Sequence, residues 1–431
     1  MMYYSTNGKA PDATLRKAVV NGLAEDRGLY MPRRIPRLPD RFFEDMAQMS
    51  FQELSCAVAD AFFGEDIPAD DLHRIVQETL SFDCPTYQIE ENIWVLELFH
   101  GPTLAFKDVG ARFMARLLAY FSDNSPVNVL VATSGDTGSA VANGFLGVEG
   151  VRVFVLYPKG KVSPIQECQF TTLGQNITAL EIDGCFDDCQ ALVKNAFMDA
   201  DLRAKMKLTS ANSINVARFL PQSFYYFNAV ARLRRAGISE APVICVPSGN
   251  FGNLCAALFA AEMGLPVKRF IAANNSNRVF YDFLQDGQYR PRPSIQTLAN
   301  AMDVGDPSNF ARIWELYDRD ADAVRAHISG AVVDDKTIER TILECYSDTG
   351  YLLDPHGACG YRALKDGLRD GEKGIFCETA HPAKFLEKME EITALEIDVP
   401  QRLAAFMKGT KQSVPLGKDY EGFRDFLVSS I

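Results

Sequence analysis

From about residue 93 onward, the sequence alternates between short apolar runs and amphipathic segments, with turns rich in Gly, Ser, Thr and Asn between them. The apolar runs at residues 93–99, 127–132, 151–157, 177–182, 242–246, 269–273 and 374–377 are typical of buried strands. This alternation predicts an α/β fold in which parallel sheets are flanked by helices on both faces. Ligands of such folds bind at the carboxyl ends of the strands. Chemistry is therefore expected in the strand-to-helix turns.

The chain of 431 residues is too long for a single hydrophobic core and predicts two or three domains. Residues 1–92 carry helical patterns at 12–23, 42–63 and 69–81 and are expected to form a mainly helical N-terminal extension or cap. Residues 93–237 are expected to form a smaller α/β domain and residues 238–431 a larger one. The segment 274–307 is expected to be mostly loop.

Composition limits the partners that the chain can have. A formal net charge of −12 and a pI near 5.1 argue against nucleic acid, so an anionic ligand would need a local positive pocket. No apolar run reaches the roughly 18 residues that a membrane span needs, and no basic segment precedes an apolar core near residue 1. We expect a cytoplasmic protein without a membrane partner, either a monomer or a homodimer. Neither the ten cysteines nor the five histidines are spaced like metal ligands, so no metal site is predicted.

Lys107 lies among the apolar residues Leu104, Phe106 and Val109, near the start of a helix expected at residues 109–121. Burial and a helix N-terminus both disfavour the ammonium ion, so the pKa of Lys107 should be lowered. A lysine that is neutral part of the time can form an imine with an aldehyde. A solvated surface lysine is the alternative that this local context leaves open.

Three further turns have the composition of anion-binding sites. Residues 248–253 (Ser-Gly-Asn-Phe-Gly-Asn) and 133–139 (Thr-Ser-Gly-Asp-Thr-Gly-Ser) can direct backbone amides and hydroxyls at a carboxylate or phosphate. In residues 209–218, Asn212, Ser213 and Asn215 can donate hydrogen bonds, and Arg218 can hold a phosphate through its planar guanidinium. Taken singly, each of the first two turns is better explained as an ordinary strand-to-helix loop, and the third is equally compatible with a helix cap followed by a surface arginine.

Together, these motifs resemble those of the threonine synthases. The resemblance rests on His100-Gly-Pro-Thr-Leu-Ala-Phe-Lys-Asp108, Ser134-Gly-Asp-Thr-Gly, Asn212-Ser-Ile-Asn-x-Ala-Arg218, the turn at 248–253 and Thr379-Ala-His-Pro-Ala383. The N-terminal stretches at residues 3–8 and 28–32 also resemble that family, so the likeness covers nearly the whole chain. It implies a pyridoxal 5'-phosphate enzyme of fold type II, the tryptophan-synthase β-subunit group, with the cofactor between two α/β domains.

The resemblance also implies a role for each motif. Lys107 would be the catalytic Schiff-base lysine in the smaller domain, and the turn Gly249, Asn250, Phe251, Gly252 and Asn253 in the larger domain would bind the cofactor phosphate. Thr379 would meet the pyridine nitrogen, and Asp136 stands near the position at which relatives carry an asparagine facing the ring hydroxyl. Substrate contacts would come from Ser134, Thr137, Asn212, Ser213 and Arg218, the last three at its phosphate. His100 and His381 are expected to shape their turns.

The implied reaction is that of a carbon–oxygen lyase, the conversion of O-phospho-L-homoserine and water to L-threonine and phosphate by γ-elimination and β-addition. Two alternatives stay open. A related pyridoxal-phosphate lyase, either a hydroxyamino-acid dehydratase or a phospho-lyase, would keep Lys107 and the turn at 248–253. A non-catalytic α/β protein that binds a phosphate ligand would account for the turns but not for the lysine.

Overall fold

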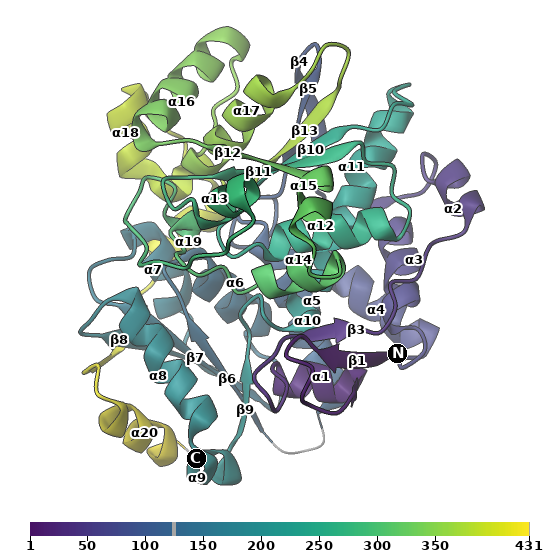
Figure 1. Cartoon of the computed structure of the whole chain (residues 1–431). Helices are drawn as coiled ribbons and strands as arrows, with labels where there is room; N and C mark the ends of the chain where they lie inside the picture. The colour runs from purple at the N-terminus through teal and green to yellow at the C-terminus, as the bar shows by residue number, and fades with distance from the viewer. Residues whose placement is uncertain (123–125, 431) are drawn as a thin grey trace.

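The structure is a computed structural model that describes residues 1–122 and 126–430, and it contains two large sheets and one small one (Figure 1). The larger sheet has six strands in the order β12-β11-β10-β13-β5-β4. Its strands are β4 (Thr86–Glu90), β5 (Ile93–Glu97), β10 (Val243–Pro247), β11 (Arg269–Asn274), β12 (Ile328–Val332) and β13 (Gly374–Glu378). All neighbours are parallel except β4, which pairs antiparallel with β5 at one edge.

The second sheet has five parallel strands in the order β14-β8-β7-β6-β9. They are β6 (Val127–Ala132), β7 (Val151–Pro158), β8 (Ile177–Ile182), β9 (Lys207–Ser210) and β14 (Val414–Leu416). Strand β6, which pairs with β7 and β9, is buried along its whole length, as its mostly apolar sequence predicts. The predicted α/β class with parallel sheets is therefore confirmed.

The N-terminal region contains a small antiparallel sheet that the sequence did not predict. Strands β1 (Met2–Ser5), β2 (Ala13–Thr14) and β3 (Tyr30–Pro32) form it in the order β2-β1-β3. The helices here are α1 (Leu15–Asn21), α2 (Asp40–Asp45), α3 (Phe51–Phe63) and α4 (Ala69–Thr79). The single helix expected at 42–63 is wrong, because Ser50 and Glu53 form a capping box that starts α3 as a separate helix.

Helices cover both large sheets (Figure 1). Those between β5 and β9 are α5 (Lys107–Phe121), α6 (Asp136–Phe145), α7 (Pro164–Thr171), α8 (Phe186–Met198) and α9 (Ala200–Lys205). Those between β9 and β12 are α10 (Val216–Phe219), α11 (Ser223–Arg235), α12 (Gly252–Glu262), α13 (Val279–Asp286), α14 (Phe310–Leu316) and α15 (Ala321–His327). The remainder are α16 (Asp335–Thr349), α17 (Pro355–Gly367), α18 (Leu386–Thr393), α19 (Gln401–Met407) and α20 (Tyr420–Ser429), with 3₁₀ turns η1 (Leu220–Gln222), η2 (Asn300–Met302) and η3 (Pro382–Phe385).

Two strands do not lie in the sheet that the predicted domain boundaries suggest. Strand β5, expected to open the smaller domain, pairs with β13 in the six-stranded sheet. Strand β14, near the end of the chain, returns to pair with β8 in the five-stranded sheet. The division into residues 1–92, 93–237 and 238–431 stays a prediction, with these two strands as exceptions to its sheet assignment. Among the described residues, the helices are all too short or too polar to cross a membrane.

Candidate active site

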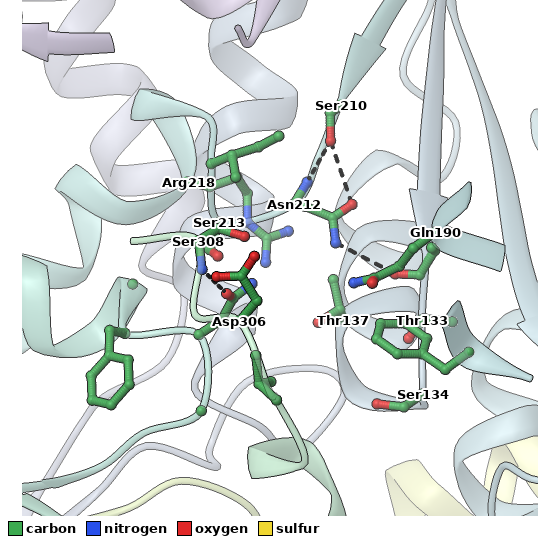
Figure 2. A pocket seen from close by; sticks show the side chains of 18 of the residues that line it. Thr133, Ser134, Thr137, Gln190, Ser210, Asn212, Ser213, Arg218, Asp306 and Ser308 are labelled. Carbon is green, nitrogen blue, oxygen red and sulfur yellow. Dashed lines mark hydrogen bonds between the residues drawn. The ribbon is translucent and has the colours of Figure 1, made fainter. Parts of the chain in front are cut away.

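One cavity of about 1020 Å³ opens between the two large sheets and the N-terminal region. Thirteen of the residues for which the sequence predicts a site role lie in its lining, and Figure 2 shows part of this wall. These residues are Lys107, Ser134, Asp136, Thr137, Asn212, Ser213, Arg218, Gly249, Asn250, Phe251, Gly252, Asn253 and Thr379. Asn215, the further donor expected in the same segment as Asn212, is not among the lining residues, because its Nδ2 donates to the carbonyls of Val19 and Ser210. The structure therefore brings together turns that are far apart in the sequence.

Backbone hydrogen bonds set Lys107 beside Thr379. The loop before α5 runs antiparallel to the loop after β13. The amide of Phe106 donates to the carbonyl of Thr379 at 2.9 Å, and the amide of His381 donates to the carbonyl of Leu104 at 3.1 Å. Lys107 is the first residue of α5, so its side chain enters the cavity where β13 ends. His381 has a structural role here, because its Nδ1 accepts from the amide of Ala383 and begins η3.

The surroundings of Lys107 favour a neutral amine. The pKa of Lys107 is lowered to about 8, chiefly by burial, with Asp136 raising it and the cations Arg218 and Lys384 lowering it. This direction agrees with the sequence prediction. At neutral pH an appreciable fraction of the amine is then unprotonated, which a lysine needs in order to react with an aldehyde.

Asp136 is held by a lysine that the sequence analysis missed. The Nζ of Lys384 lies 2.6 Å from Oδ1 of Asp136, and Nε2 of Gln166 donates to the same oxygen at 2.9 Å. Burial alone would raise the pKa of Asp136, but Lys384 and Lys107 lower it below its ordinary value. Asp136 is therefore an ionised carboxylate in the cavity wall.

The turn at residues 248–253 offers backbone amides rather than side chains. Phe251 takes the left-handed conformation with φ 60° and directly precedes α12, whose N-terminus lies in the cavity lining. Asn253 is used within the turn, where its Oδ1 accepts from Ser248 Oγ at 2.5 Å and its Nδ2 donates to the carbonyl of Pro247 at 2.9 Å. Asn250 likewise accepts from the amide of Ser308 at 2.7 Å. A helix N-terminus of this kind favours an anion.

Arg218 is a buried cation without its usual partners. It is only 2% exposed, and among the described residues its Nε and Nη1 have no hydrogen-bond partner. Burial lowers the pKa of Arg218 to about 10, so the guanidinium stays charged at neutral pH. Figure 2 shows the guanidinium pointing into the cavity between Asn212 and Asp306. Unpaired donors on a buried cation are costly, and an anionic ligand would satisfy them.

A second buried arginine, Arg312, positions the loop that carries Ser213 and was not predicted. Its guanidinium donates to the carbonyl of Ser213 at 3.1 Å and to the carbonyl of Tyr30 at 3.2 Å. It also donates to Oδ1 of Asn309, whose Nδ2 donates to Oγ of Ser213 at 3.0 Å. Asn309 and Arg312, at the start of α14, therefore hold the hydroxyl of Ser213 in place.

Thr133, which was not assigned a role, shapes the turn that carries Ser134 and Thr137. Its Oγ1 accepts from the amides of Gly135 at 2.9 Å and Gly138 at 2.8 Å. Gly135 has φ 145°, and a Cβ there would lie 2.5 Å from the side chain of Gln166. Only glycine fits this bend, which leaves Ser134 and Thr137 in the cavity wall (Figure 2).

Comparisons with known proteins give the class of this fold and site. Residues 77–376 match the family model described as "Pyridoxal-phosphate dependent enzyme", and residues 2–80 match "Threonine synthase N terminus". The chain is therefore a member of the pyridoxal-phosphate-dependent enzymes. It is 44% identical over 429 residues to the threonine synthase of Escherichia coli, with 100% of each chain covered, and 44% identical to that of Serratia marcescens, with 99% of each covered.

Solved structures agree with these matches. The crystal structure of the Escherichia coli threonine synthase has a TM-score of 0.94 to this chain at 44% identity, covering 100% of both. A threonine synthase from Brucella melitensis with bound pyridoxal phosphate has a TM-score of 0.92 at 36% identity, covering 99% of this chain and 98% of its own. This chain belongs to the threonine synthase family. It is a lyase that depends on pyridoxal phosphate, and the predicted resemblance, fold type and cofactor are confirmed.

The residues of the cavity fit this cofactor. An amine of lowered pKa, an amide-rich turn at the start of α12 and the Thr379 hydroxyl surround one space. The first suits an aldehyde, the second a phosphate and the third a ring nitrogen. The guanidinium of Arg218, whose Nε and Nη1 have no partner among the described residues, offers a second group of donors for an anion in the same cavity.

Proposed function

We propose that this chain converts O-phospho-L-homoserine and water to L-threonine and phosphate. The observation that carries the proposal is the buried guanidinium of Arg218, whose Nε and Nη1 have no partner among the described residues, in the same cavity as Lys107. A phosphorylated amino acid bound to the cofactor would present its phosphate to such a group. The family to which the chain belongs supports the same assignment.

In this proposal the turn at Gly249–Asn253 holds the cofactor phosphate through backbone amides, and Thr379 meets the pyridine nitrogen as a hydroxyl. A neutral partner leaves that nitrogen less protonated than a carboxylate would, which suits elimination and replacement. Asp136 would stand near the ring hydroxyl. Bound pyridoxal phosphate supplies an electron sink for the carbanion formed at the substrate α-carbon.

The chain's own residues would bind the substrate and move its protons. Lys107 would hold the cofactor through its aldehyde, and its amine would remove the substrate α-proton and carry protons at Cβ. Asn212, Ser213 and Arg218 bind the substrate phosphate, which leaves from Cγ, and Ser134 and Thr137 bind the opposite end of the substrate. Water then adds at Cβ. We also propose that the protein acts in the cytoplasm, as a monomer or a homodimer, without nucleic acid or membrane as partner.

The first test is to incubate the purified protein with O-phospho-L-homoserine and to follow the products by NMR, beside a Lys107→Ala variant. We expect threonine and phosphate in equal amounts, and a fall of about 10³-fold or more in the variant. Release of 2-oxobutyrate and ammonia instead would identify a related lyase. A protein that binds phosphate but never the cofactor would support a non-catalytic phosphate-binding role.

A further inference from the structure

The ion pair between Asp136 and Lys384 includes a lysine to which the reaction described above gives no role. Its side chains are 3% and 0% exposed, and Nζ of Lys384 also donates to the carbonyl of Thr103 at 2.8 Å. A buried charge is costly unless it is paired and hydrogen-bonded. Each member of the pair is therefore tolerated here because the other is present.

The pair joins the two large sheets at the cavity. Asp136 is the first residue of α6, which follows β6 of the five-stranded sheet, whereas Lys384 lies in η3, which follows β13 of the six-stranded sheet. Gln166, on α7, adds a third contact from the side of the five-stranded sheet. The carboxylate is thus held in one orientation from both sides of the site.

One oxygen of Asp136 remains available to the cavity. The contacts from Lys384 and Gln166 both use Oδ1, so among the contacts of the described residues Oδ2 is the acceptor left for a group in the cavity. Both members of the pair also act on Lys107. Asp136 raises the pKa of Lys107 and Lys384 lowers it, and Arg218 on α10 is the other charge that faces this amine.

We propose that Lys384 is a positioning residue, which fixes the orientation of the Asp136 carboxylate and balances its charge beside Lys107. The pair then offers the cofactor a hydrogen-bond acceptor without adding a net negative charge next to the reacting amine. This inference rests on the proposed function, in which Lys107 carries the cofactor. It assigns a role to Lys384, a residue that lies outside the sequence motifs described above.

The decisive measurement is the pKa of Lys107 in the full-length protein without cofactor. It is read from the pH dependence of labelling by an amine reagent, with the peptide containing Lys107 quantified by mass spectrometry. Wild type is compared with Asp136→Asn, Lys384→Met and the double variant.

Asp136→Asn leaves Lys384 as an unbalanced cation, so we expect the pKa of Lys107 to fall by about one unit or more. Lys384→Met should raise it while Asp136 stays ionised, and the double variant should return it to within about half a unit of wild type.

The absorbance of the bound cofactor as a function of pH gives a second readout. Each single variant should shift the titration of the visible band, and the double variant should shift it less than either. The matched control is the surface pair Lys388 and Glu391, in which Nζ lies 2.6 Å from Oε2 and the side chains are 58% and 68% exposed. Lys388→Met, Glu391→Gln and their combination should leave both titrations unchanged.

An unchanged pKa of Lys107 in all three variants would overturn the proposal, as would a double variant in which the pKa of Lys107 stays as far from wild type as it is in Asp136→Asn. If Lys384→Met does not fold, the difference in the pKa of Lys107 between Asp136→Asn and the double variant still tests the proposal, because only Asp136→Asn leaves an unpaired buried cation. The labelling needs no turnover. Failure to form threonine with the expected pKa pattern would therefore count against the proposed function alone, and threonine formation without that pattern would count against Lys384 alone.

Discussion

Lys107 and Arg218 show how burial has different consequences for two cations in one cavity. The pKa of Lys107 falls to about 8, near working pH, whereas that of Arg218 falls only to about 10. Lysine can therefore exchange protons, and arginine stays a fixed charge for an anion. The two residues cannot replace each other, although both are buried and basic.

The lowered pKa of Lys107 predicts how stability depends on pH. Between the folded value of about 8 and the ordinary value of 10.5, the unfolded chain binds more protons than the folded protein. Stability without cofactor should therefore rise with pH in this window, by up to about 1.4 kcal/mol per unit. The measurement is the difference in free energy of unfolding between wild type and Lys107→Met at several pH values. A difference that does not change with pH would contradict the burial of this amine, and Lys388→Met serves as an exposed control.

Replacing Arg218 should affect the substrate and leave the cofactor bound. Arg218→Met removes at least two charge-assisted hydrogen bonds to a phosphate, which should lower kcat/KM for O-phospho-L-homoserine by about 10²- to 10³-fold. The affinity for pyridoxal phosphate, measured by absorbance, should stay close to that of wild type. Arg290→Met is the control, since Arg290 is 57% exposed and pairs with Asp286 at the surface. An equal loss in both variants would exclude Arg218 as the phosphate ligand.

At this scale the sequence predicts residues that lie in motifs and misses those that act through distant partners. Thirteen predicted site residues line the cavity because each follows a strand whose carboxyl end faces it, whereas Asn215 is bonded within the fold instead. Lys384 and Arg312 were missed because their partners, Asp136 and Tyr30 among them, are remote in the sequence. A single sequence has no signal for such pairs. Lys384 directly follows the Thr379 motif, and this closeness was the one available clue.

Among elements, the crossing of α5 and α10 depends on a glycine. A Cβ on Gly110 would lie 2.3 Å from the carbonyl oxygen of Arg218, so the two helices approach as closely as they do only because Gly110 has no side chain.

Gly110→Ala should force α10 away and carry Arg218 with it. We expect a destabilisation of about 1–3 kcal/mol from overpacking, together with a raised KM for the substrate. Denaturant unfolding and steady-state kinetics measure the two effects. Gly422→Ala in the surface helix α20 is the control, because a Cβ there would lie 3.2 Å or more from its nearest neighbour, the flexible side chain of Asp419. If both variants showed the same stability and the same KM, the position of Arg218 would not depend on the close packing of α10 against α5.

Elements with strong apolar patterns were predicted well, and marginal ones were not. Strands β6 and β8 begin and end where the sequence predicts, because their sequences are mostly apolar and each pairs with a strand on both sides within the sheet. The edge strands β4 and β12 are only partly buried, so their sequences lack a clear alternation. Helix α13 lies inside the segment predicted as loop, where its eight residues gave too short a pattern to recognise.

For the whole molecule, the two large sheets are tied together because the chain crosses between them more than once. Strand β5 lies in the six-stranded sheet before the chain enters the five-stranded one, and β14 and α20 return to the latter at the end. The sequence could not predict these crossings, because a strand's pattern reports its burial and not the sheet to which it belongs. Residues that never touch the cavity can therefore support one of its walls.

The C-terminal helix α20 should stabilise the wall that carries Ser134, Asp136 and Thr137. Phe423 is fully buried in a cluster with α8 and the five-stranded sheet, so Phe423→Ala should cost about 3–5 kcal/mol. Because this cluster underlies β6, we expect thermal inactivation at a lower temperature, with unchanged kcat and KM in the protein that remains folded. Leu343→Ala on α16, whose side chain is 46% exposed, should change stability by less than about 0.5 kcal/mol. Equal inactivation temperatures for the two variants would mean that α20 only covers the sheet and does not hold the active-site wall in place.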